Sequence, residues 1–194
     1  MIWGTGVNGK FLPPKNRIDR LDIRSVRGPL TANFLRQHGV STPSIFGDPG
    51  LLIPRLFPEV ASWASVKNSQ YLLIPNLNDY KTWFGGARSA NVLNPTSDVW
   101  HCIRSIAASE LIIASSLHAL VLADALGIPT IPVSSLSEPP FKYRDYYEGT
   151  GRKMPDFASS LREAFSMSPV DPPCSLPLES IVSAFPWDLW GGGR

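Results

Sequence analysis

The chain has 194 residues, which is enough for one domain or one and a half. Hydrophobic residues make up 43% and charged residues 18% of it, as in ordinary globular proteins, and no apolar run approaches the roughly 18 residues that a membrane-spanning helix needs. The net charge of +2 gives no indication of a nucleic-acid partner. Cys102 and Cys174 form neither a disulfide framework nor a metal motif, and no secretory signal is seen, so we expect a cytoplasmic location.

The first third of the chain carries few regular patterns. Short strands are predicted at 21–26 and 44–46, with a helix over 29–38 between them. Proline suits the first helical position and a glycine at 39 suits the exit. Residues 54–69 show no clear period, and we interpret them as a connection between two lobes.

The rest of the chain alternates between short apolar strands and helices. Strands are predicted at 71–75, 91–93, 111–114 and 130–133. Helices are predicted at about 98–108, 117–125, 141–148, 155–165 and 178–185. Residues 168–177 are rich in proline and serine and predict a loop, and the glycine-rich tail 187–194 predicts frayed chain.

The most informative stretch runs from 111 to 133. A buried apolar strand is followed by Ser115-Ser116, either of which can cap the next helix, and Gly127 with Pro129 marks the exit of that helix before another apolar strand. This is the strand–helix–strand crossover of an open parallel sheet, which predicts an α/β fold. Such sheets bind ligands at the carboxyl ends of their strands.

His118 lies at that position, in the first turn of the predicted helix. Unpaired backbone N–H groups, the hydroxyls of Ser115 and Ser116 and the positive end of the helix dipole surround it, so Ser115 to Leu117 predict an anion site beside a proton donor. His38 and His101 have no such setting. The sequence shows no acid partner that would complete a Ser-His-Asp triad with Ser116 and His118. No cluster of His, Cys or acidic residues has the spacing of metal ligands.

Gly4, Gly6 and Gly9 match the spacing of the dinucleotide-binding fingerprint. Pro13-Pro14 would break the helix that should follow these glycines, which argues against NAD binding. We therefore interpret Gly4 and Gly6 as a turn in which the backbone approaches a ligand or a neighbouring lobe.

Arg27 stands out among five arginines between positions 17 and 36. It follows the strand predicted at 21–26 and precedes Gly28-Pro29, where a helix opens, so its guanidinium can grip a phosphate or carboxylate. Asp48, within Gly-Asp-Pro, is either a turn-forming residue or an acid of the site.

Taken together, these residues resemble the polysaccharide pyruvyl transferase family, in particular the ketal pyruvyltransferases of exopolysaccharide synthesis. Five segments between residue 1 and about 150 carry the resemblance. They are Ile2-Trp-Gly-Thr-Gly-Val-Asn-Gly9, Val26-Arg-Gly-Pro-Leu-Thr31, Phe46-Gly-Asp-Pro-Gly-Leu-Leu52, Ala114-Ser-Ser-Leu-His-Ala-Leu120 with Ala123-Asp-Ala-Leu-Gly-Ile-Pro129, and Pro140-Phe-Lys-Tyr-Arg-Asp-Tyr146.

The resemblance implies two Rossmann-like lobes, as in metal-independent GT-B glycosyltransferases, with the first lobe incomplete. We expect residues 1–66 to be the remainder of an N-terminal acceptor lobe and 67–194 a C-terminal donor lobe. The implied reaction moves the enolpyruvyl group of phosphoenolpyruvate onto a sugar as a pyruvate ketal, with no cofactor and no metal. The acceptor is then a saccharide that can be lipid-linked, with peripheral association at the inner face of the membrane.

The resemblance also assigns roles to residues of this chain. His118 is the expected general acid and base, Arg27 and Lys142 the anion clamps, and Ser115, Ser116 and Leu117 the donor site at the helix terminus. Some branches carry arginine where this chain has Ser116, so Arg27 or Lys142 must supply the missing charge. Asp48 would act as a second acid or support the site.

Two other interpretations stay open from the sequence. One is a metal-independent glycosyltransferase that uses a nucleotide-sugar, for which Glu138 could hold the ribose. The other is a non-catalytic remnant or subunit that supplies only part of a cleft.

Overall fold

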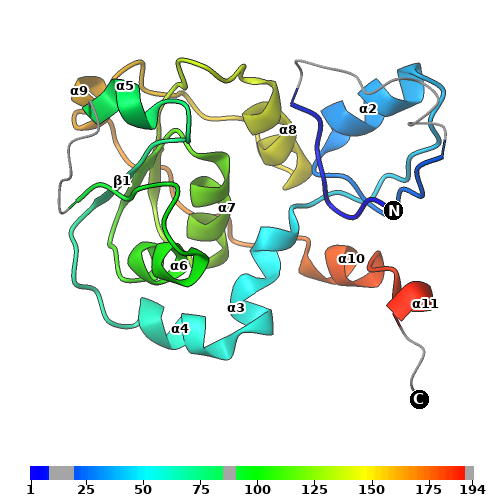
Figure 1. Ribbon diagram of the computed structural model, residues 1–194, viewed down its shortest axis with the longest axis horizontal. Helices are drawn as coiled ribbons and strands as arrows, with labels where there is room; N and C mark the ends of the chain where they lie inside the picture. Colours follow the sequence, from blue (N-terminus) through cyan, green and yellow to red (C-terminus); the bar gives the residue numbers. More distant parts are fainter. Residues whose placement is uncertain (9–19, 85–90, 191–194) are drawn as a thin grey trace. The chain divides into compact units, whose positions relative to one another are not determined.

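The computed structural model describes residues 1–8, 20–84 and 91–190 (Figure 1). The chain divides into two compact units. The first unit comprises Met1–Pro49, Phe141–Met154 and Leu176–Arg194, and the second comprises Gly50–Pro140 and Pro155–Ser175. Each unit has its own set of elements and its own buried apolar cluster, described in turn below.

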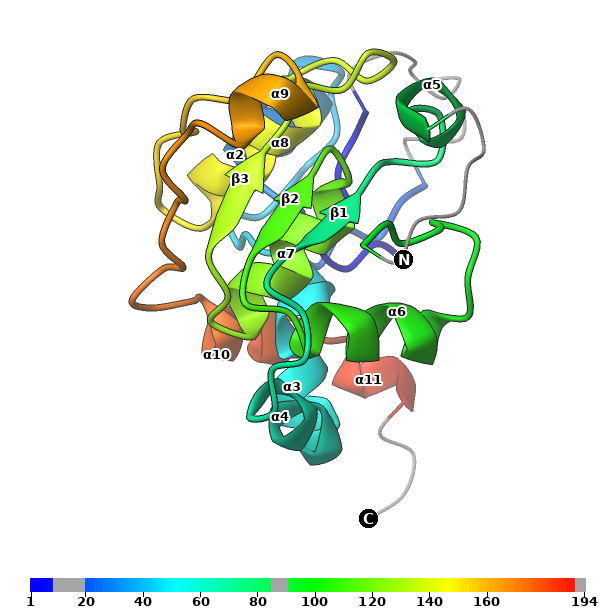
Figure 2. The same ribbon diagram turned by 90° about the vertical axis from the view of Figure 1, so that its left-hand side faces the viewer.

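The second unit is built on a parallel sheet of three short strands. They are β1 (Leu72–Ile74), β2 (Ile112–Ala114) and β3 (Thr130–Pro132), in the order β1-β2-β3, and every residue in them is buried. The register places Ile113 opposite Leu73 on one side and Ile131 on the other. Figure 2 shows the three strands side by side and pointing the same way. The predicted strand–helix–strand crossover and the α/β fold are thus confirmed.

The second unit also contains helices, of which α7 packs directly on the sheet. They are α3 (Ile53–Leu56), α4 (Pro58–Ala64), α5 (Tyr80–Phe84), α6 (Val99–Ala107), α7 (Leu117–Ala125) and α9 (Leu161–Ala164). A single 3-10 turn, Pro49–Leu52, leads into α3. Helix α7 contacts β2, β3, α3 and α6, and six of its nine residues are buried. It is apolar all round because it packs on several sides rather than along one stripe.

The ends of α6 and α7 follow the predicted signals. Asp98 caps α6, where its Oδ1 accepts hydrogen bonds from the backbone N–H groups of Trp100 at 2.9 Å and His101 at 3.1 Å. Gly127 follows α7 with a φ of +67°, and the N–H of Ile128 then reaches back to the carbonyl of Ala123 at 2.9 Å. This left-handed position is the one that favours glycine after a helix.

The regular elements described in the first unit are helices. They are α2 (Pro29–Gln37), α8 (Phe141–Gly149), α10 (Leu178–Ser183) and α11 (Trp187–Trp190). In place of the strands predicted at 21–26 and 44–46, isolated parallel bridges join Ile2 to Ile23, Thr5 to Val26, and Val26 to Phe46. The core packs Val26 and Phe46 against Ala32, Leu35 and Val40, so the predicted segments do lie together.

Several predicted boundaries were wrong. Helix α4 and all but the first residue of α3 fall inside 54–69, because Pro54 and Pro58 occupy first-turn positions where proline starts a helix. Helix α9 is shorter than 155–165 because Ser160 accepts a hydrogen bond from the Glu163 N–H and fixes the start there. Part of the tail predicted to fray forms α11, and the strand predicted at 91–93 is a single bridge between Leu73 and Val92.

The compact units group the chain differently from the expected lobes. Residues 50–66 belong to the second unit, whereas 141–154 and 176–194 belong to the first. The two units are defined by compactness alone. The division into acceptor and donor lobes therefore stays a prediction, as does the two-lobe GT-B-like arrangement.

Candidate functional site

The carboxyl ends of the three strands bring polar residues together in the second unit. Asn76 and Asp79 follow β1, Ser115 and Ser116 follow β2, and a serine-containing loop, 134–137, follows β3. Parallel strands end at one edge of a sheet, and this edge is the usual ligand-binding edge of such folds. Helix α7 begins at the same edge, directly after β2.

The start of α7 offers backbone donors rather than a closed cap. Ser116 occupies the N-cap position with an extended backbone, and among the described residues its side chain makes no capping hydrogen bond. The first N–H groups of a helix have no partner within the helix. Leu117 is buried, so it can serve a ligand only through its backbone, whereas Ser116 is half-buried and the His118 side chain is exposed.

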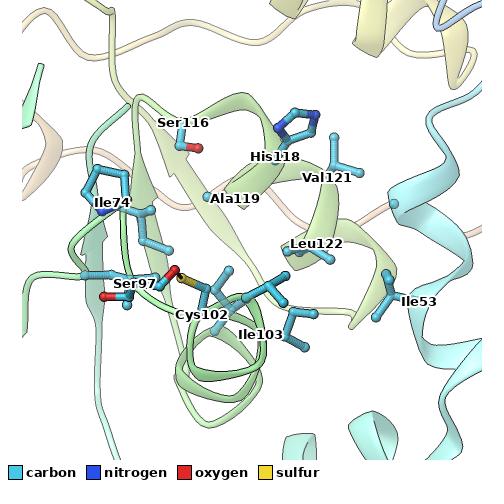
Figure 3. Close-up of a pocket in the computed structure, with 15 residues that line it drawn as sticks. Ile53, Ile74, Ser97, Cys102, Ile103, Ser116, His118, Ala119, Val121 and Leu122 are labelled. Carbon is cyan, nitrogen blue, oxygen red and sulfur yellow. Dashed lines mark hydrogen bonds between the residues drawn. The ribbon is translucent and has the colours of Figure 1, made fainter. Parts of the chain in front are cut away.

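Ser116 and His118 line a cavity of about 400 Å³. Figure 3 shows both residues at the start of α7, on one side of the cavity, with Cys102 and Ile103 of α6 on the other. Most of the remaining lining is apolar: Gly50, Ile53, Ile74, Leu93, Pro95, Val99, Ile106, Ala119, Val121 and Leu122, together with the polar Ser97. A mostly apolar lining with a few polar groups is the common form of a small-molecule site.

Cys102 on the cavity wall is held as a thiol. Burial raises its pKa above the usual range, and the nearby charge of Asp98 acts in the same direction. Its Sγ lies 3.8 Å from the carbonyl oxygen of Ser97, as a weak donor. Because the thiolate is the nucleophilic form, this environment favours a packing role for Cys102.

Ser115 does not face the cavity with its hydroxyl. The residue is fully buried, and its Oγ donates to Oδ2 of Asp79 at 2.8 Å while accepting from the N–H of Asn76 at 3.1 Å. Sequence reasoning missed Asp79. The only local signal for it was Asn76, whose side chain turns the chain after β1 by accepting from the N–H groups of Asn78 and Asp79.

Arg27 lies in the first unit as one half of a buried ion pair. It is 7% exposed, and its guanidinium lies 3.1 Å from Oδ2 of Asp145 and donates to the carbonyl of Val7 at 2.8 Å. Asp145 is fully buried and also accepts from Thr31, through the backbone N–H at 2.9 Å and the hydroxyl at 2.6 Å. Asp145 therefore caps α2 from a distant part of the chain, in place of the side chain that Gly28 lacks.

Glycines let the backbone approach this pair. A Cβ at Gly6 would collide with the guanidinium of Arg27, and one at Gly28 would collide with the carbonyl oxygen of Asp145. The turn predicted to approach a ligand or lobe thus places Gly6 against an arginine of its own unit. Gly4 has a φ of +71° and packs on Pro49, whereas Gly9 lies outside the described residues.

The structure collects the predicted site residues in two groups. Ser115 to His118 lie in the second unit, whereas Gly4, Gly6, Arg27, Asp48 and Lys142 lie in the first. Lys142 is half-buried with its Nζ 5.1 Å from the ring of Tyr143, and Asp48 is buried. The catalytic and binding roles of these residues stay predictions. Among the described residues, no group of three or more His, Cys, Asp or Glu side chains could hold a metal ion, and no helix has the length and apolar character to cross a membrane.

Comparison with known proteins places the chain in a family. Residues 1–137 match the family model of polysaccharide pyruvyl transferases. A curated relative, the succinoglycan biosynthesis protein ExoV of Rhizobium meliloti, is 32% identical over 161 residues, covering 78% of this chain and 48% of the relative. The chain thus spans about half the length of that relative. No solved structure matches the chain. With the predicted resemblance confirmed, the chain belongs to the polysaccharide pyruvyl transferase family.

Proposed function

We propose that this chain acts in the transfer of the enolpyruvyl group from phosphoenolpyruvate to a sugar of an exopolysaccharide or its precursor, forming a pyruvate ketal. Family membership and the name of the ExoV relative support this class of reaction. The observation that carries it is the exposed imidazole of His118 in the first turn of α7, on a cavity between α6 and α7 that reaches Ile74 at the end of β1.

The chemistry needs proton transfer and stabilisation of a departing phosphate. Two hydroxyls of the sugar bond to C2 of phosphoenolpyruvate, the C2–O bond to phosphate breaks, and C3 gains a proton to become a methyl group. The two hydroxyls release two protons. C3 gains one proton in exchange, and the phosphate product carries the other. An imidazole exchanges protons near neutral pH, so His118 can serve as the general acid and base, for roughly 10²–10⁴-fold in rate.

Donor binding would use the start of α7. The helix dipole, the N–H groups that open the helix and the hydroxyl of Ser116 favour an anion, and they need no metal or cofactor. Arg27 and Lys142 remain our proposed cations. Substituting Arg27 would also break its buried ion pair with Asp145 and so lower stability. Substituting Lys142 therefore gives the clearer test of binding. We further propose a saccharide acceptor, which can be lipid-linked at the inner face of the membrane.

Calorimetric titration of phosphoenolpyruvate into the purified chain tests the donor assignment. We expect saturable binding that weakens in His118→Ala and Lys142→Ala. His101→Ala is the matched control, because His101 is also an exposed histidine at the start of a helix in the second unit but does not line the cavity. Its affinity for phosphoenolpyruvate should equal that of the wild type.

Competition separates the proposal from a nucleotide-sugar enzyme. Excess UDP or GDP should leave the binding of phosphoenolpyruvate unchanged. Displacement by a nucleotide would favour the glycosyltransferase interpretation, with Glu138 as the residue to substitute next. Absence of heat from a well-folded sample would contradict the donor assignment for this chain.

A further inference from the structure

One buried carboxylate joins the loops that follow all three strands. Asp79 is 1% exposed, and it follows β1. Its Oδ2 accepts from Ser115, just after β2, at 2.8 Å, and from Asn76 at 2.6 Å. Its Oδ1 accepts from the loop after β3, through the hydroxyl of Ser137 at 3.0 Å and the N–H of Leu136 at 3.2 Å. Four donors from three loops thus converge on one side chain.

These contacts fix the residues that immediately precede α7. Besides donating to Asp79, the hydroxyl of Ser115 accepts from the N–H of Asn76 at 3.1 Å. The N–H groups of Ser115 and Ser116 both donate to the carbonyl of Ile74, at 3.1 and 3.2 Å. Every hydrogen bond described here to Asp79 comes from a neutral donor. Two of these donors, Ser115 and Asn76, belong to buried residues, where weakening the acceptor costs most.

We propose that Asp79 is a positioning residue for the start of α7, and therefore for the phosphoenolpyruvate site of the proposed function, on which this role rests. Asp79 touches no substrate. It acts through Ser115, which sets the direction in which Ser116, the opening N–H groups of α7 and His118 meet a ligand. Preorganised donors lose much of their effect when displaced by about 1 Å, so a loosened Ser115 weakens binding without unfolding the sheet.

Asp79→Asn is the sharpest variant, because it keeps the size of the side chain and replaces one acceptor oxygen by an NH2 group that faces other donors. We expect the dissociation constant for phosphoenolpyruvate to rise roughly tenfold to a hundredfold, with the binding stoichiometry unchanged. Ser115→Ala should act in the same direction, and the double variant should fall short of the product of the two effects, because both break one network.

The control is Ser160→Ala, which removes the capping acceptor of α9. It lowers stability while leaving Asp79 and its four contacts intact, so its dissociation constant should match that of the wild type. A merely structural role of Asp79 would lower the number of binding sites through unfolding and leave the dissociation constant unchanged. That pattern in Asp79→Asn would overturn the proposal.

Amide hydrogen exchange without any ligand separates this proposal from the proposed function. In Asp79→Asn, the amides of Ser115 and Ser116 should exchange faster, while that of Ile112, bonded to Pro129 within the sheet, should keep its wild-type rate. If the wild type binds no phosphoenolpyruvate, the proposed function fails, and the exchange rates still decide whether Asp79 orders the start of α7. Unchanged rates at Ser115 and Ser116 would contradict the positioning role.

Discussion

At the scale of single residues, the buried pair of Arg27 and Asp145 has the largest predicted effect on stability. Asp145→Asn leaves the guanidinium of Arg27 in a buried site without its counter-charge and weakens the cap of α2. Breaking a buried pair in this way costs about 3 kcal/mol or more. We expect a loss of that size in the free energy of unfolding, measured with urea.

The control for this prediction is an exposed pair in the same unit. Arg24 meets Asp188 at 2.8 Å, both side chains being partly open to solvent, so Asp188→Asn should leave the unfolding curve close to that of the wild type. Equal losses in the two variants would show that burial does not set the strength of the Arg27 pair.

The partners of Asp79 and Asp145 could not be found from the sequence. Asp79 accepts a hydrogen bond from Ser115, which lies 36 positions away in the sequence, and Asp145 accepts one from Arg27, 118 positions away. Short-range spacing carries no information on such partners, and both residues look like ordinary surface acids in the sequence. Arg27 was predicted to hold an anionic ligand, and that role stays a prediction. Its position at the end of an apolar segment fits the observed ion pair with Asp145 as well as it fits a ligand site.

At the scale of elements, the sequence predicted the strands and helix ends that depend on interactions between residues close together in the chain. The apolar runs of β1, β2 and β3 and the glycine after α7 each depend on neighbours within a few residues, and all were predicted. Helices α3 and α4 were missed because they are short and derive their stability from packing, α4 against α6 and α3 against α7. The three-residue strands likewise depend on their neighbours for register.

The exit of α7 gives an element-scale prediction. Gly127 has a φ of +67°, and an added Cβ would meet no other atom within 4 Å. Gly127→Ala should therefore cost about 1 kcal/mol through backbone conformation rather than through a clash. Thermal or urea unfolding measures the loss. Gly127→Asn is the matched variant, because asparagine tolerates the left-handed region better, and it should lose less. A larger loss in the asparagine variant would contradict this conformational explanation.

At the scale of the whole molecule, each compact unit has its own buried cluster. Val26, Ala32, Leu35 and Val40 form one in the first unit. Leu73, Ile113, Ile131, Val133, Ala158 and Ala164 form the other in the second unit. Proteins open in cooperative segments that follow such clusters. The resemblance to a two-lobe enzyme predicted a division of the chain, but the segments that return to the first unit, 141–154 and 176–194, were not predictable, because long-range packing alone assigns them.

The same two stability variants test whether the units behave separately. Asp145 joins α2 to α8, so Asp145→Asn should speed amide exchange in these helices while the amides of β1, β2 and β3 stay near wild-type rates. Gly127→Ala should do the reverse, because α7 packs directly on β2 and β3. Mass-resolved hydrogen exchange of both variants under native conditions makes the comparison. If both variants instead speed amide exchange uniformly along the chain, the chain opens as one cooperative unit. Destabilising either cluster would then raise the exchange rates at the start of α7, including His118, to the same extent.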